Sequence, residues 1–215
     1  MKTILFINGG KVEKELPSQR FRLRLEWAIE YFRQNHKTQD ITFFISGRWG
    51  RVTENFLMTE AEVGKQFILQ ELPDAKVIKE DISVELIGNY AFSKPLIKAL
   101  TPDNVIIITS DILKKRVKHI TKRVFAEEFA YEYHFIQDEL SGNAALLEKD
   151  AKALNFFRKL FSEVSSGNDH AVREILFYKT PYYFKGIVDD KAFFETYWEG
   201  GFASYIEGIT IRNNK

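Results

Sequence analysis

The chain has 215 residues, a formal net charge of +1 and no Cys, and 45% of its residues are hydrophobic. This length fits one domain with additions, and the near-neutral charge gives no global field that would favour nucleic acid. The lack of Cys excludes disulfides, thiol catalysis and cysteine-ligated metal sites. The start MKTILFINGG has too few apolar residues for a secretory signal, and no apolar run reaches the roughly 18 residues of a membrane span. We therefore expect a cytoplasmic protein with no membrane partner.

Short runs of β-branched and aromatic residues predict five strands, at residues 3–7, 41–45, 76–79, 105–108 and 131–136. Helical patterns separate them at residues 18–35, 60–72, 86 onward and 112–129, and Pro95 is expected to kink or interrupt the third of these helices. This alternation is typical of βαβ units. It predicts an α/β fold of the Rossmann-like kind, with three α/β/α layers and a mainly parallel sheet of about five strands.

The pattern changes after Gln137. Residues 143–178 look helical with a break at 165–168, and residues 179–205 are rich in aromatic side chains. We therefore divide the chain into a Rossmann-like domain (1–140) and a helical, aromatic-rich extension (141–215) packed on it. The sequence leaves two roles open for the aromatics: core packing, or an interface that makes a homo-oligomer.

Three predicted strands end in small polar residues, and in parallel sheets ligands bind beyond these carboxyl ends. The strand-end residues are Gly9, Gly10, Ser46, Gly47, Thr109, Ser110 and Asp111. Glycine lets the backbone approach a ligand and offer its N–H groups, although ordinary turns use the same residues. Ser110 lacks the GxSxG context of a hydrolase nucleophile. We expect one ligand site at this edge.

Three arginines are candidates to bind an anionic ligand there. Arg24 lies on the apolar stripe of its predicted helix, where a structural ion pair is the alternative role. Arg48 opens a loop (48–58) that would either close over an anionic or planar ligand or stay solvated. Arg116 lies one turn into the helix that follows the fourth strand.

Two glutamates are candidates for acid–base catalysis. Glu60 begins a helix, where a carboxylate is also favourable without any catalytic role. Glu80 and Asp81 close the third strand and would suit Mg²⁺ or ribose hydroxyls, with Ser83 either part of the site or a helix cap. The four His residues are widely spaced, so we assign no metal site.

In order along residues 3–136, these motifs resemble the YdcF-like family (the ElyC/SanA/YdcF group, a domain of unknown function). The matching segments are Gly9-Gly10, Arg24-Leu25 with Ala28-Ile29, Ser46-Gly47, Thr59-Glu60-Ala61, Glu80 to Ser83 with Asn89-Tyr90-Ala91, and Thr109 to Asp111 with Arg116. Arg48 stands where the family has a second Gly, Leu86 where Thr is usual and Leu113 where His is usual.

The resemblance implies that a nucleotide-like or otherwise anionic small molecule binds at the strand ends, with Asn89 among the ligand-binding residues. S-adenosylmethionine is associated with one member, so S-adenosylmethionine and Mg²⁺ are the cofactor candidates, and neither is assigned. Two hypotheses remain. The protein is a hydrolase or transferase acting on a phosphorylated or nucleotide-like metabolite, or it is a non-catalytic ligand-binding or regulatory protein, which the missing family His favours.

Overall fold

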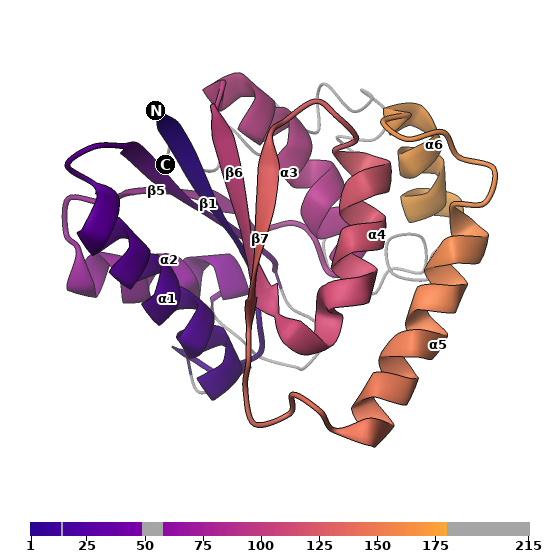
Figure 1. The fold of residues 1–215 in the computed structure, drawn as a ribbon, viewed down its shortest axis with the longest axis horizontal. Coiled ribbons are helices and arrows are strands. Elements are labelled where there is room, and N and C mark those ends of the chain that lie inside the picture. The colour runs from indigo at the N-terminus through magenta and orange to yellow at the C-terminus, as the bar shows by residue number, and fades with distance from the viewer. Residues whose placement is uncertain (14, 49–57, 180–215) are drawn as a thin grey trace.

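The computed structural model describes residues 1–13, 15–48 and 58–179. Five strands form one parallel sheet in the order β5-β4-β1-β6-β7, which is the predicted fold class (Figure 1). The strands are β1 (Lys2–Asn8), β4 (Asp40–Ser46), β5 (Lys76–Glu80), β6 (Asn104–Ser110) and β7 (Tyr131–Ile136). Since β1 is central, the chain must cross from β5 at one edge back past β4 and β1 to reach β6.

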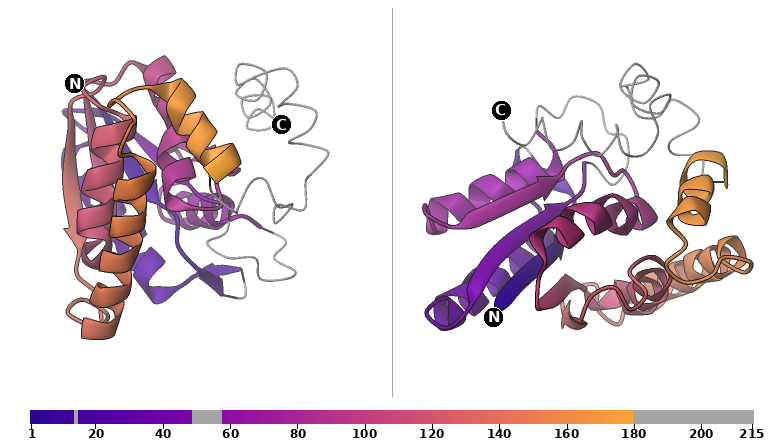
Figure 2. Two further views of the ribbon diagram at one scale, coloured as in Figure 1. Left: turned by 90° about the vertical axis from the view of Figure 1, so that its right-hand side faces the viewer. Right: turned by 90° about the horizontal axis from the view of Figure 1, so that it is seen from above.

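That crossing decides which face of the sheet each helix covers. Helices α1 (Gln19–Asn35) and α2 (Glu60–Glu71) pack with Leu5 and Ile7 of β1. Helices α3 (Leu86–Leu100) and α4 (Lys114–Val124) pack on the opposite face with the alternate residues Ile4 and Phe6. The three layers are visible in Figures 1 and 2. Both faces of β1 are therefore buried, as its continuous apolar run requires.

Some predicted boundaries are wrong. Helix α3 continues through Pro95, so of the two expected effects, a kink or an interruption, the interruption does not occur. Neighbouring side chains such as Phe92 and Ile97 are fully buried and hold the helix in place. Helix α4 ends at Val124 and not near residue 129, because Ala126 adopts a left-handed conformation with φ of 51°. A short 3₁₀ turn, η1 (Asp111–Leu113), precedes α4, and a small hairpin of β2 (Val12–Glu13) and β3 (Leu16–Pro17) was not expected.

Other local signals are confirmed. The hydroxyl oxygen of Thr59 accepts a hydrogen bond from the N–H of Glu62 at 3.1 Å, which caps α2 as its sequence predicts. Helices α5 (Ala144–Leu160) and α6 (Asp169–Glu174) leave a break between them where the sequence has Ser165 to Asn168. Helix α5 packs against α4 and η1, and α6 packs against α3.

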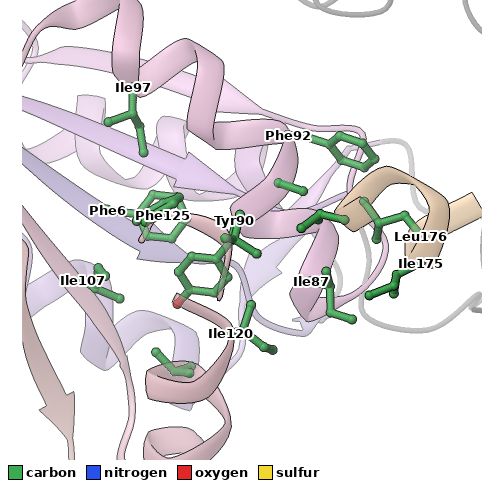
Figure 3. Packing of buried hydrophobic residues seen from close by; sticks show 14 of the residues in the cluster. Phe6, Ile87, Tyr90, Phe92, Ile97, Ile107, Ile120, Phe125, Ile175 and Leu176 are labelled. Carbon is green, nitrogen blue, oxygen red and sulfur yellow. The ribbon is translucent and has the colours of Figure 1, made fainter. Parts of the chain in front are cut away.

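One hydrophobic cluster joins the sheet to the C-terminal helices. The ring of Tyr90 lies 5.2 Å from that of Phe6 and 5.3 Å from that of Phe125, measured between centroids. Ile175 and Leu176, in the π-helical turn after α6 (η2, Ile175–Lys179), belong to the same cluster (Figure 3). The described part of the extension thus shares its core with the sheet.

Two sequence-based predictions fall outside the described residues: most of the loop 48–58, and the role of the aromatic residues beyond 179 in core packing or oligomerisation. Among the described helices, none is long and apolar enough to cross a membrane.

Candidate functional site

The carboxyl ends of the parallel strands meet at one edge, and backbone hydrogen bonds join their connecting loops. The N–H of Gly9 donates to the carbonyl of Ser46 at 2.6 Å, and the N–H of Gly47 donates to the carbonyl of Glu80 at 2.9 Å. The N–H of Arg48 reaches the carbonyl of Ser83 at 2.7 Å. These bonds hold the loops after β1, β4 and β5 together just beyond the sheet.

A cleft of about 620 Å³ lies beyond this edge, bordered by the loops after β1, β5 and β6. Strands β1 and β6 are the neighbours between which the sheet order reverses, which is where open α/β sheets bind ligands. The predicted residues that line the cleft are Gly9, Gly10, Arg24, Glu60, Ser83, Asn89, Ser110 and Arg116. The other predicted residues, which do not line it, are Ser46, Gly47, Arg48, Glu80, Thr109 and Asp111.

Arg24 is a buried cation in this site, with only 5% of its surface exposed. Its Nη1 donates to the carbonyl of Asn8 at 2.5 Å and to that of Gly9 at 2.8 Å. Burial lowers the pKa of Arg24 from 12.5 to about 10, and the nearby carboxylate of Glu60 opposes that shift. The guanidinium is therefore still charged at neutral pH. No described residue accepts a hydrogen bond from its Nη2, which lies beside Gly10.

Glu60 explains why two strand ends carry glycine. A Cβ on Gly9 would lie 2.5 Å from Glu60 Oε2 and 2.7 Å from the carbonyl oxygen of Ser46. A Cβ on Gly47, whose φ is 140°, would also lie 2.5 Å from Glu60 Oε2. The first residue of α2 therefore places its carboxylate against two backbone segments that only glycine allows to come so close. Glu60 is 6% exposed and lines the cleft.

Glu80 lies behind the cleft and is fully buried. Its Oε1 accepts hydrogen bonds from the backbone N–H groups of Ile82 and Ser83, at 2.7 and 2.8 Å. Its Oε2 contacts the hydroxyls of Ser46, at 2.6 Å, and Ser83. Burial, partly offset by these hydrogen bonds, raises the pKa of Glu80 from 4.5 to about 7. This position does not suit Glu80 for direct contact with a ligand in the cleft.

The Ser83 hydroxyl has two neighbouring acceptors, the carboxylate of Glu80 and the side-chain oxygen of Asn89. The Ser83 hydroxyl contacts Glu80 and also lies 2.6 Å from Asn89 Oδ1, yet it has a single proton to donate. In its protonated form, which its raised pKa favours below about pH 7, Glu80 can donate to Ser83 and free the Ser83 proton for Asn89. Glu80 thus orients two residues that line the cleft. The helix cap of α3 is Glu85, whose carboxylate accepts from the N–H groups of Ile87 and Gly88, so capping by Ser83 is excluded.

Ser110 places a buried hydroxyl at the end of β6. Its side chain is fully buried, lines the cleft, and makes no hydrogen bond of ordinary geometry within the described part of the chain, although it lies near enough to Asp138 to help lower that carboxyl's pKa. Thr109 is buried behind it, and Asp111 turns toward Lys114, 3.9 Å away. Ser110 is therefore the residue of this predicted trio that a ligand would meet.

Two ion pairs at the cleft were not predicted from the sequence. Arg116 Nε donates to Asp150 Oδ1 of α5 at 2.6 Å, so this predicted anion ligand already has a protein partner. Arg20 pairs in the same way with Asp138 at 2.7 Å. Arg20 carries a weak signal, since it precedes Arg24 by one helical turn. Asp150 carries none, because nothing in the sequence of α5 shows which of its faces meets the sheet domain.

Other cleft residues that were not predicted as site residues come from four segments. They are Lys11, Val84, Glu85, Leu86, Ile112 and Leu113, with Leu146, Lys149, Ala153, Phe156 and Phe157 from α5. Among the described residues, no group of three His, Cys, Asp or Glu side chains is arranged to hold a metal ion.

We compared the chain with models of protein families, with curated proteins and with solved structures, and none of the three comparisons gave a match.

Proposed function

We propose that this chain binds an anionic, nucleotide-like small molecule in the cleft at the carboxyl ends of β1, β5 and β6. The observation that carries the proposal is Arg24, a buried cation fixed by two strand-end carbonyls, whose Nη2 lies beside Gly10 and has no acceptor among the described residues. A charged group is costly to bury, and a guanidinium edge without a partner in a cleft suits an anion. The buried hydroxyl of Ser110, which lines the cleft and makes no hydrogen bond of ordinary geometry within the described residues, adds a second polar group for such a ligand.

Our proposal includes an enzymatic role, with a hydrolase or transferase reaction on a phosphorylated metabolite. Glu60 is the candidate acid–base residue because its buried carboxylate lines the cleft. Glu80 is assigned a positioning role because it lies behind Ser83 and Asn89. Cofactors, whether S-adenosylmethionine or Mg²⁺, stay unassigned.

The second candidate is a ligand-binding or regulatory protein without turnover. One observation favours it: Leu113 lines the cleft where the resembling family has His, and no described His is among the lining residues.

We also propose that the chain is a diverged, cytoplasmic YdcF-like protein. This is supported by the position of its motif residues, since Gly9, Arg24, Asn89 and Ser110 line one cleft.

A matched pair of serine variants tests ligand binding. Ser110 and Ser93 are both fully buried, and neither hydroxyl makes a hydrogen bond of ordinary geometry within the described residues, but only Ser110 lines the cleft. Ser110→Ala should weaken binding of inorganic pyrophosphate about tenfold in titration calorimetry, because a hydrogen bond to a charged group is lost. Ser93→Ala should leave the affinity unchanged. Equal affinities in both variants, or no binding of pyrophosphate or nucleotides to the wild type, would contradict the proposal.

Turnover separates the two candidates. We would assay phosphatase, nucleotidase and transferase activities with and without Mg²⁺, using wild type and Glu60→Gln. Activity that disappears in Glu60→Gln while pyrophosphate still binds supports an enzyme. Saturable binding with no product in any assay supports the non-catalytic role.

A further inference from the structure

One wall of the cleft is a stripe of α5. Leu146, Lys149, Asp150, Ala153, Phe156 and Phe157 all line the cleft. They recur at intervals of three and four residues, which places them on a single face of the helix. Leu146, Ala153 and the two phenylalanines make most of this stripe apolar, in contrast to the strand-end floor with Arg24, Glu60 and Ser110.

Phe156 is not needed to attach α5 to the protein. It is 47% exposed, whereas Leu154 on the same helix and Phe161 at its C-cap are 5% and 0% exposed. Phe157 is also engaged, because its ring lies 5.8 Å below the guanidinium carbon of Arg116. The Phe156 ring, 5.9 Å from that of Phe157, is thus an exposed aromatic surface on the rim of a polar site.

We propose that the ligand of this cleft carries a flat aromatic group, as a nucleoside phosphate does, and that this group packs against Phe156. The inference rests on the proposed function, since the anionic part of the ligand is assigned to Arg24 and Ser110. A bare phosphate would fill little of a cleft of about 620 Å³ and would leave the apolar wall wet. A nucleotide fits both parts of the cleft, because its phosphates would contact the polar strand-end residues and its base would pack against the aromatic residues of α5.

The test compares two ligands that differ in the aromatic group. Titration calorimetry on the full chain would use inorganic pyrophosphate, which has only the anion, and ADP, which adds ribose and a base. We expect wild type to bind ADP about tenfold more tightly than pyrophosphate. Phe156→Ala should remove most of this difference by weakening ADP binding and leaving pyrophosphate binding unchanged.

Leu147→Ala is the matched control. Leu147 is 45% exposed on the same helix but does not line the cleft, so its removal should change neither affinity. Equal wild-type affinities for ADP and pyrophosphate would overturn the aromatic-group inference and leave anion binding standing. The inference would also be overturned if Phe156→Ala weakened the binding of ADP and pyrophosphate equally, or weakened the binding of neither. Failure of the wild type to bind either ligand would overturn the proposed function as well.

Discussion

At the scale of single residues, the hydrogen bonds among the polar groups behind the cleft depend on whether Glu80 carries a proton as well as on its charge. Glu80 accepts two backbone hydrogen bonds and contacts two hydroxyls, and Ser83 has to serve both Glu80 and Asn89. Adding a proton to Glu80 satisfies this network, and burial favours the same neutral form. The residue that the sequence offered as an acid–base catalyst is therefore better explained as a support for Ser83 and Asn89.

This protonation predicts a pH dependence of stability. The folded-state pKa of Glu80 is about 7 and the unfolded value is 4.5, so the folded state holds the proton more tightly. Below the unfolded value both states are protonated and nothing is lost. As pH rises from 4.5 through 7, the unfolded state ionises first, and the free energy of unfolding falls by on the order of 3 kcal/mol. Glu80→Gln, which mimics the neutral acid, should remove this decrease.

Urea unfolding at several pH values between 5 and 8 would measure it. Glu163→Gln is the control, because Glu163 is exposed and its variant should follow the wild-type profile. Parallel profiles for wild type and Glu80→Gln would show that Glu80 is not protonated in the folded protein.

At the scale of elements, α5 is tied to the site by the ion pair between Asp150 and Arg116. Both partners are largely buried, with side-chain exposures of 8% and 21%. Losing one partner of such a pair leaves a desolvated charge, which costs much more than losing an exposed pair. This pair connects the helix that carries Phe156 to the helix that follows β6.

Asp150→Asn should therefore lower the free energy of unfolding by about 2 kcal/mol. The control is Glu148→Gln, which breaks the exposed i,i+4 pair with Lys152 on the same helix and should cost less than about 0.5 kcal/mol. Chemical denaturation of both variants gives the comparison. Equal losses would show that the Asp150 pair is no more than a surface contact.

At the scale of the whole molecule, the described residues share cores across the sheet and the C-terminal helices. Phe161, Ile175 and Leu176 lie in the same cluster as Phe6 and Tyr90. A sheet domain without α5 and α6 would leave this cluster open to water. The described part of the chain is therefore expected to unfold as one cooperative unit.

Substitution of two phenylalanines in the C-terminal helical region tests whether the described part of the chain unfolds as one cooperative unit. Phe161→Ala, at a position with no exposure, should lower the free energy of unfolding by about 3–5 kcal/mol and reduce hydrogen-exchange protection in β1 and β6 as well as in α5. Phe156→Ala, at a half-exposed position, should cost less than about 1 kcal/mol. Loss of protection confined to α5 in Phe161→Ala would show that the extension unfolds independently.

Local signals predicted the elements well. The strand runs, the Thr59 cap and the break near residue 165 depend on neighbouring residues, so the sequence displays them directly. Helix ends were less predictable, because the left-handed Ala126 carries no residue signal and because the packing that carries α3 past Pro95 is tertiary. The site followed the same division. The sequence pointed to Gly9 and Ser110 because they follow or end predicted strands, and to Arg24 because it is a cation on an apolar helix stripe. It did not point to Asp150 and Phe156, because they lie on α5, far along the chain from the strand ends.

The sequence by itself determined the strands, the parallel sheet and the edge where polar groups collect, because each is a property of short segments with one periodicity. Only the tertiary structure decided the strand order, and with it the crossing that places the cleft between β1 and β6. It also moved Glu80 behind the cleft and brought Asp150 to Arg116. Such placements depend on which faces pack together over long sequence separations, and the free energy of that packing is shared among many residues and not contained in any one motif.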